Sequence, residues 1–187
     1  MAWTKESVTI NKFERTFEVY RQESSLSCGP ACIVMVSQLK YGTYTSEAIA
    51  KVWFAKLENK GNLPGVPKGT AKVDRVLNWR HESQIDTILR VLQTQKIGGN
   101  PYLASDVKDA SSCTQHEPGI LRVQWVEGNG TGGVNLRGGH FVVCVGHSQD
   151  QWIYLDSEHG VVTVPAAPPY YIRGERMGLF THLLQVT

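Results

Sequence analysis

A cysteine stands where an apolar segment begins in the stretch YRQESSLSCGPACIVMV, residues 20–36. Cys28 is followed by Gly29 and Pro30, and proline is favoured in the first helical turn, where its missing N–H is no loss. Apolar residues at helical spacing follow, and Gly42 is a typical residue to end the helix. The sequence therefore predicts Cys28 at or just before the N-terminus of a buried helix, a position that favours the thiolate.

The chain has three further cysteines, Cys32, Cys113 and Cys144. Disulfide frameworks belong to short, cysteine-dense secreted chains, and a structural zinc site needs a second close pair beside Cys28 and Cys32. A reactive thiol with distant histidine and carboxylate partners fits the spacing better. Cys32 and Cys144 lie in apolar segments and are expected in the core, whereas Cys113, in the polar segment DASSCTQHE, is expected to be an exposed loop thiol.

A nucleophilic cysteine needs an imidazole that takes its proton, and His140 is the best placed of the six histidines. It follows LRGG and opens the apolar segment HFVVCV, so we expect its ring at a strand edge with small residues around it. Asp156 ends the next predicted strand, sixteen residues on, and can fix the imidazole tautomer. His147 and His159 are the rival bases, and they fit these geometric roles less well.

Acyl transfer also needs donors for the developing oxyanion. Gln22 lies six residues before Cys28, and its side-chain amide can serve together with the backbone N–H of Cys28. We therefore expect Gln22, Cys28, His140 and Asp156 to form one site.

The elements that position these residues change type along the chain. Residues 7–22 predict one or two short strands, and helices are expected from Pro30, from Ser46, over 71–80 and over 82–95, with a loop at 60–70. Short segments rich in β-branched and aromatic residues then predict strands, and the run at 140–145 predicts a strand covered on both faces. This order is that of an α+β fold, with a helical half at about 23–97 and an antiparallel sheet half at about 101–187, in a single domain of residues 1–187.

Length and composition limit the classes of function. The 187 residues are 41% hydrophobic and 19% charged, values typical of a soluble globular protein. A net charge of +2 without a Lys/Arg block gives no reason to expect a nucleic-acid partner. The sequence contains no apolar run of the roughly 20 residues that would span a bilayer, and its start is too polar for a secretory signal. We expect a soluble protein, either cytoplasmic or delivered by a dedicated secretion system, with no membrane insertion, no metal and no cofactor.

The four site residues together resemble the papain-like cysteine peptidases. QESSLSCGPAC, GGHFVVCVG and WIYLDSEHG look most similar to the branch that removes double-glycine leader peptides from bacteriocin precursors. The resemblance implies a papain-like fold in which Cys28 heads the central helix and His140 and Asp156 follow on the sheet. It also implies cleavage after Gly-Gly in a protein or peptide substrate. Asp156 is followed by Ser157 where that branch commonly has proline, and the segments at 57–70 and 126–139 are extra loops that could shape the substrate groove.

The exporter's membrane helices and ATPase have no counterpart in this sequence, so the resemblance implies a freestanding peptidase or a domain of a longer protein. Similar domains act as toxins delivered between bacteria, an analogy that would bring an immunity protein as partner. Two other functions stay open. A transglutaminase or glutamine deamidase uses the same Cys, His and Asp order, and a non-catalytic module would bind peptides without turnover.

Overall fold

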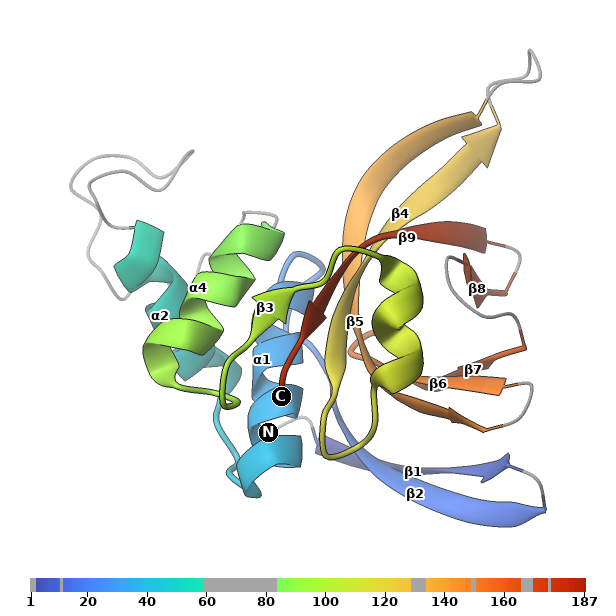
Figure 1. The fold of residues 1–187 in the computed structure, drawn as a ribbon, viewed down its shortest axis with the longest axis horizontal. Coiled ribbons are helices and arrows are strands. Elements are labelled where there is room, and N and C mark those ends of the chain that lie inside the picture. Colours follow the sequence, from blue (N-terminus) through green and yellow to red (C-terminus); the bar gives the residue numbers. More distant parts are fainter. Residues whose placement is uncertain are drawn as a thin grey trace.

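The chain folds as a β-hairpin, a group of helices and an antiparallel sheet, in that order (Figure 1). This confirms the mixed α+β class, while the assignment of a single domain stays a prediction. The structure is a computed structural model, and it describes residues 3–10, 12–58, 84–128, 134–148, 151–165, 170–174 and 176–187, without the side chains of 58, 128 and 134–138.

The N-terminal hairpin leads directly into the segment that contains Gln22. It consists of β1 (Trp3–Ile10) and β2 (Phe13–Tyr20), paired antiparallel, which confirms the predicted strands. The hairpin packs beside β7 (Gly160–Val164) of the main sheet. The Glu6 carboxylate fixes this contact, because it accepts a hydrogen bond of 2.9 Å from the Val161 backbone N–H.

Three described helices lie on one side of the sheet: α1 (Cys28–Tyr41), α2 (Glu47–Glu58) and α4 (Ile85–Gln95) (Figure 1). All three were predicted. The expected C-terminus of α1 and the expected N-terminus of α2 are confirmed. Gly42 ends α1 with a φ of 65°, a conformation that glycine adopts without strain. The Ser46 hydroxyl accepts a bond from the Ile49 N–H at the start of α2. The predicted loop 60–70 and helix 71–80 lie outside the described residues.

The main sheet has the strand order β3-β9-β4-β5-β6-β7 within the described residues, and β8 pairs with β9. The expected strands β3, β4, β5, β6 and β7 are present, but β8 and β9 were not predicted. The extra loop expected at 126–139 is wrong for its described residues, because β4 continues to Gly128 and β5 begins at Val134. β9 separates β3 from β4, so the C-terminal segment lies inside the sheet rather than at its edge. The bounds are β3 (Tyr102–Leu103), β4 (Gly119–Gly128), β5 (Val134–Ser148), β6 (Gln151–Asp156), β8 (Tyr170–Arg173) and β9 (Arg176–Gln185).

Strand β5 is covered on both faces, as its apolar run predicted. Phe141 and Val143 join the core that contains the helices, whereas Val142 and Cys144 join a second core. The short 3₁₀ helix η1 (Val107–Ser112) packs on β5 and β9 and brings Cys113 into that second core.

The exposed position expected for Cys113 is therefore wrong, because the residue is only 3% exposed. Its thiol forms a hydrogen bond with that of Cys144. A polar local sequence did not keep the side chain in solvent, since η1 seats it against the sheet. The expectation that Cys32 and Cys144 are buried is confirmed.

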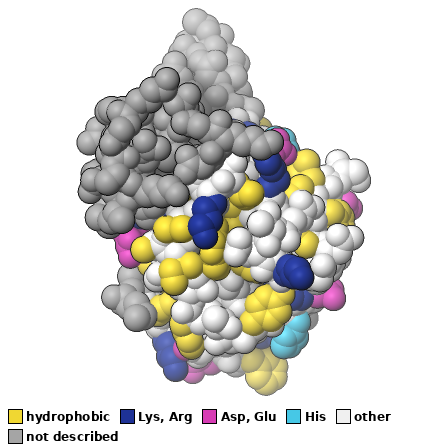
Figure 2. Space-filling view, turned by 90° about the vertical axis from the view of Figure 1, so that its left-hand side faces the viewer, with side chains coloured by type: hydrophobic (Ala, Val, Ile, Leu, Met, Phe, Trp, Pro, Cys, Tyr) yellow, Lys and Arg dark blue, Asp and Glu magenta, His cyan; other side chains and the backbone are white. Residues whose placement is uncertain are grey.

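Among the described residues, no helix has the length and apolar character that crossing a bilayer requires. Exposed large apolar side chains on the helices include Tyr41, Ile49 and Val52. Figure 2 views the molecule from the helical side and shows apolar side chains among uncharged, basic and acidic ones.

Candidate active site

The thiol of Cys28 is held at the first residue of α1. The preceding segment forms a tight turn, in which the Ser27 hydroxyl donates to the Ser24 carbonyl at 2.9 Å and accepts from the Ser24 N–H at 3.1 Å. The Ser27 carbonyl then accepts the first helical bond, from the Ala31 N–H, at 2.9 Å. Cys28 is 6% exposed. The first backbone N–H groups of a helix have no partner within it, so Cys28 sits where backbone donors and the helix dipole favour negative charge.

His140 and Asp156 are brought to one face of the sheet by the pairing of β5 with β6. Val143 pairs with Leu155 in this antiparallel register. One residue further, Asp156 lies opposite Val142, so Asp156 is a diagonal neighbour of His140. This register depends on a β-bulge between Cys144 and Gly146, without which the faces of the two strands would be offset by one residue.

Glycine makes this bulge accessible. Gly146 has a φ of 124°, a backbone conformation that residues other than glycine rarely adopt. The backbone conformation of Gly146 thus contributes to the strand register that brings His140 beside Asp156.

The His140 ring lies between Asp156 and Cys28. Its Nε2 is 2.9 Å from Asp156 Oδ1, and the ring also forms a hydrogen bond with the Cys28 side chain. Since Nε2 faces the carboxylate, Nδ1 is the nitrogen left for the thiol. An ionised carboxylate only accepts hydrogen bonds, so Nε2 carries a proton. In the neutral ring Nδ1 is then unprotonated and can take the proton of Cys28.

The carboxylate of Asp156 is fully buried and held by donors on both oxygens. Oδ1 also accepts from the backbone N–H of Glu158 at 2.8 Å and of His159 at 3.3 Å. Oδ2 accepts from the Tyr171 hydroxyl at 2.5 Å. With donors on both oxygens, the carboxylate is held in one orientation, and this orientation fixes the imidazole.

The proton affinities of this pair follow from the same contacts. Burial opposes the charged imidazolium, but the hydrogen bonds with Asp156 and Cys28 outweigh it and raise the pKa of His140 to about 10. Burial likewise opposes ionisation of Asp156, yet the hydrogen bond and charge of His140 hold the pKa of that carboxyl well below its usual range. The buried pair therefore favours an imidazolium beside a carboxylate over the neutral forms.

Trp125 forms a wall against the imidazole. Its ring stacks on that of His140, with the centroids 6.2 Å apart and the planes at 20°. The guanidinium groups of Arg173 and Arg176 lie over the indole, at 4.6 and 4.3 Å from its centroid. The indole limits movement of the histidine ring.

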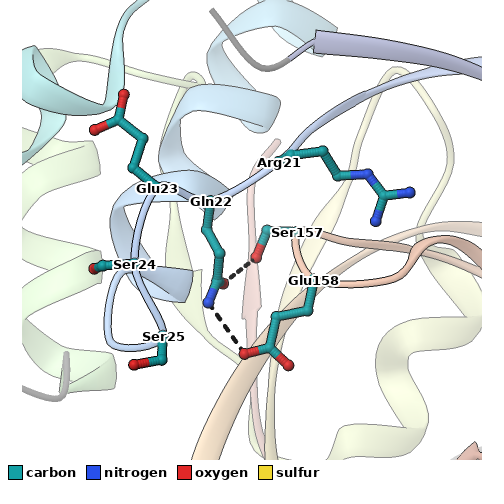
Figure 3. Close-up of a pocket in the computed structure, with 7 residues that line it drawn as sticks. All are labelled: Arg21, Gln22, Glu23, Ser24, Ser25, Ser157 and Glu158. Carbon is teal, nitrogen blue, oxygen red and sulfur yellow. Dashed lines mark hydrogen bonds between the residues drawn. The ribbon is translucent and has the colours of Figure 1, made fainter.

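Gln22 lies beside the turn that follows Asp156, on the wall of a pocket of about 560 Å³ (Figure 3). Its backbone N–H donates to the Ser157 carbonyl at 3.0 Å. The side-chain Oε1 accepts from the Ser157 hydroxyl at 2.6 Å, and Nε2 donates to Glu158 Oε1 at 3.1 Å. The structure thus attaches Gln22 to the same turn that supplies Asp156, and it engages the amide with Glu158.

The rival histidines take other positions. The His147 ring packs on Trp152, with the centroids 4.8 Å apart. The two residues are paired between the bulge and the turn that joins β5 to β6. The His159 ring lies beside Glu158, 3.5 Å from its carboxylate, and its side chain is 44% exposed.

Sequence reasoning missed Tyr171, Ser157 and Glu158. The last two immediately follow Asp156, so adjacency was a signal for them. Tyr171 lies on β8, a strand that was not predicted, and its sequence gives no sign of a contact with Asp156.

The described residues contain no group of three or more His, Cys, Asp or Glu side chains arranged to hold a metal ion. What the arrangement can do chemically is move a proton between a thiol and an imidazole at a helix N-terminus, with a buried carboxylate stabilising the charged imidazole. That is the chemistry of an activated thiol nucleophile.

Comparisons with known proteins find a likeness in structure. No protein-family model and no curated protein matches the chain. Among the solved structures, the chain is similar to a double glycine motif protease from an AMS/PCAT transporter, in complex with the leader peptide. The identity is 18%, the TM-score is 0.48, and the match covers 90% of this chain and 91% of that one. At this level of likeness, the roles of the residues rest on the geometry of the site itself.

Proposed function

We propose that the chain is a papain-like cysteine peptidase that hydrolyses peptide bonds with Cys28 as nucleophile and His140 as base and acid. One observation carries the proposal: the imidazole of His140 joins a cysteine at a helix N-terminus to a buried carboxylate that accepts hydrogen bonds on both oxygens. A buried histidine with a structural role can be satisfied by neutral partners, whereas the His140 ring bonds both an ionisable carboxyl and a thiol. Asp156 orients the ring and stabilises its charge.

The proposed reaction has two halves. His140 holds the proton of Cys28, and the thiolate attacks the peptide carbonyl carbon while the C=O electron pair moves to oxygen. Collapse of this intermediate forms a thioester and breaks the C–N bond, with the proton of His140 going to the leaving amine. Water then attacks the thioester as His140 takes its proton, and the acid leaves as the thiolate is restored. The N–H of Cys28 and the amide of Gln22 are the proposed oxyanion donors.

The substrate class follows from the motif resemblance. We propose a protein or peptide substrate that is cut after Gly-Gly. An effector role with an inhibitory immunity protein as partner is an analogy at a further remove, and the described residues offer no contact that bears on it.

The deciding experiment is product mass. Peptides with a Gly-Gly pair, and matched peptides with Ala-Ala, are incubated with the unmodified protein and with Cys28→Ala, and products are identified by mass spectrometry. Cleavage after Gly-Gly that is absent with Cys28→Ala supports the proposal. A gain of about one dalton at a glutamine without cleavage means deamidation by the same thiol chemistry. Peptide binding that survives Cys28→Ala, with no turnover by either protein, means a binding module.

A further inference from the structure

The side-chain amide of Gln22, a proposed oxyanion donor, is hydrogen-bonded to the carboxylate of Glu158. Gln22 Nε2 donates to Glu158 Oε1 at 3.1 Å, and Figure 3 shows the two side chains meeting at the pocket. A carboxylate only accepts, and the Ser157 hydroxyl donates to Oε1 of the same amide. These two contacts agree on which end of the amide is nitrogen. The donor end of Gln22 therefore points at a negative charge.

The second N–H of the amide does not remove the conflict. An oxyanion bonded to that N–H would lie within a few ångströms of the Glu158 carboxylate, and like charges at this separation repel even where the contact is exposed and solvent weakens the repulsion. Gln22 therefore stabilises an oxyanion poorly while Glu158 stays on it, whichever hydrogen is used.

Glu158 also has a charge partner that does not involve Gln22. Its Oε2 accepts from Arg173 Nη1 at 2.9 Å, and the His159 ring lies 3.5 Å from the same oxygen. The carboxylate can turn about the Arg173 contact and leave the Gln22 amide while it remains paired. Its backbone is fixed meanwhile, because the Glu158 N–H is bonded to Asp156 Oδ1.

We propose that Glu158 is a positioning residue that withholds the Gln22 amide from the oxyanion until its carboxylate turns off that amide, with Oε2 still bonded to Arg173. The inference rests on the proposed function, and it adds a control on the same site. It assigns Glu158 no contact with the reacting atoms, since it acts through Gln22.

The test compares Glu158→Gln with a matched control, Glu23→Gln. Both changes remove one negative charge from the lining of the same pocket, but Glu23 faces Tyr20 and Lys51 rather than Gln22. Two readouts are used on each protein: the inhibition constant of acetyl-Gly-Gly-aldehyde, whose adduct with the thiol places an oxygen in the oxyanion position, and the rate at which iodoacetamide alkylates Cys28, which forms no oxyanion. Peptide hydrolysis gives kcat and KM separately.

We expect Glu158→Gln to tighten aldehyde binding and to raise kcat by roughly three- to tenfold, the range for the net contribution of a typical hydrogen bond. KM and the alkylation rate should stay unchanged, and Glu23→Gln should match the unmodified protein. In a Gln22→Ala background the gain from Glu158→Gln should vanish.

Three results would overturn the inference: no gain with Glu158→Gln, a loss like that of Gln22→Ala, or a gain that persists without Gln22. Absence of an aldehyde adduct in both proteins counts against it as well, since release of Gln22 should permit one. Failure of the proposed function itself looks different. In that case iodoacetamide labels Cys28 no faster in the unmodified protein than in His140→Ala, and the inference falls with it.

Discussion

Replacing Asp156 by asparagine removes one charge from the site and leaves its shape intact. The asparagine carbonyl can take the place of Oδ1 and accept from His140 Nε2 and from the Glu158 N–H. The asparagine NH₂ then faces the Tyr171 hydroxyl, which can accept as well as donate. The variant therefore isolates the effect of the carboxylate charge on His140 from its effect on orientation.

The magnitude follows from the pKa of His140. The rise from 6.5 to about 10 corresponds to about 5 kcal/mol in favour of the imidazolium, at about 1.4 kcal/mol for each pKa unit. Asp156 contributes the leading part of that rise, through a hydrogen bond and its charge, and Cys28 contributes the rest. We expect the pKa of His140 to fall by about 2 in Asp156→Asn, equivalent to about 3 kcal/mol.

The assay is NMR titration of the histidine ring resonances, with His140→Ala used to assign them. Asp106→Asn is the matched control, because this exposed carboxylate caps η1 through the Lys108 N–H. It should leave the pKa of His140 unchanged. The reasoning is refuted if Asp156→Asn leaves that pKa where it was, or if the control lowers it equally.

Three further predictions concern stability. Folding raises the pKa of His140, so protonated His140 contributes fully to the free energy of unfolding below pH 6.5, and this contribution is lost as the pH rises towards about 10. The free energy of urea unfolding should therefore fall more over that window in the unmodified protein than in His140→Ala. Tyr171→Phe removes a donor from the buried Asp156 carboxylate and should lower the free energy of unfolding by about 1–3 kcal/mol; a change near zero would mean that the hydroxyl is not needed there. Glu47→Gln removes the charge that faces buried Lys51 at 2.5 Å and should lower it by about 3 kcal/mol, whereas the exposed change Glu14→Gln should have little effect; equal effects would contradict the importance of this buried ion pair.

The parts of the site that the sequence predicted are those set by local chemistry. Gly29, Pro30 and the apolar run indicate a helix start at Cys28 wherever that helix packs. His140 and Asp156 lie on consecutive strands joined by a short connection, so their meeting needs only a hairpin and one bulge.

The parts that were not predicted depend on contacts between distant segments. Tyr171 reaches Asp156 because β8 is carried by β9, and β9 is inserted between β3 and β4. Cys113 is buried because η1 packs on the sheet, although its neighbours are polar. The six-residue offset suggested a role for Gln22, but its contact with Glu158 depends on two side-chain conformations that no spacing specifies.

Selective alkylation of Cys28 shows whether His140 activates this thiol. The protein is treated with a stoichiometric amount of iodoacetamide at mildly acidic pH, and labelled peptides are mapped by mass for the unmodified protein and for His140→Ala. Cys32 is the internal comparison, because burial raises the pKa of its thiol well above the usual value. The account predicts rapid labelling of Cys28 alone, and loss of that selectivity in His140→Ala. Slow and equal labelling of all the thiols in both proteins would contradict an activated Cys28 and the proposed peptidase function with it.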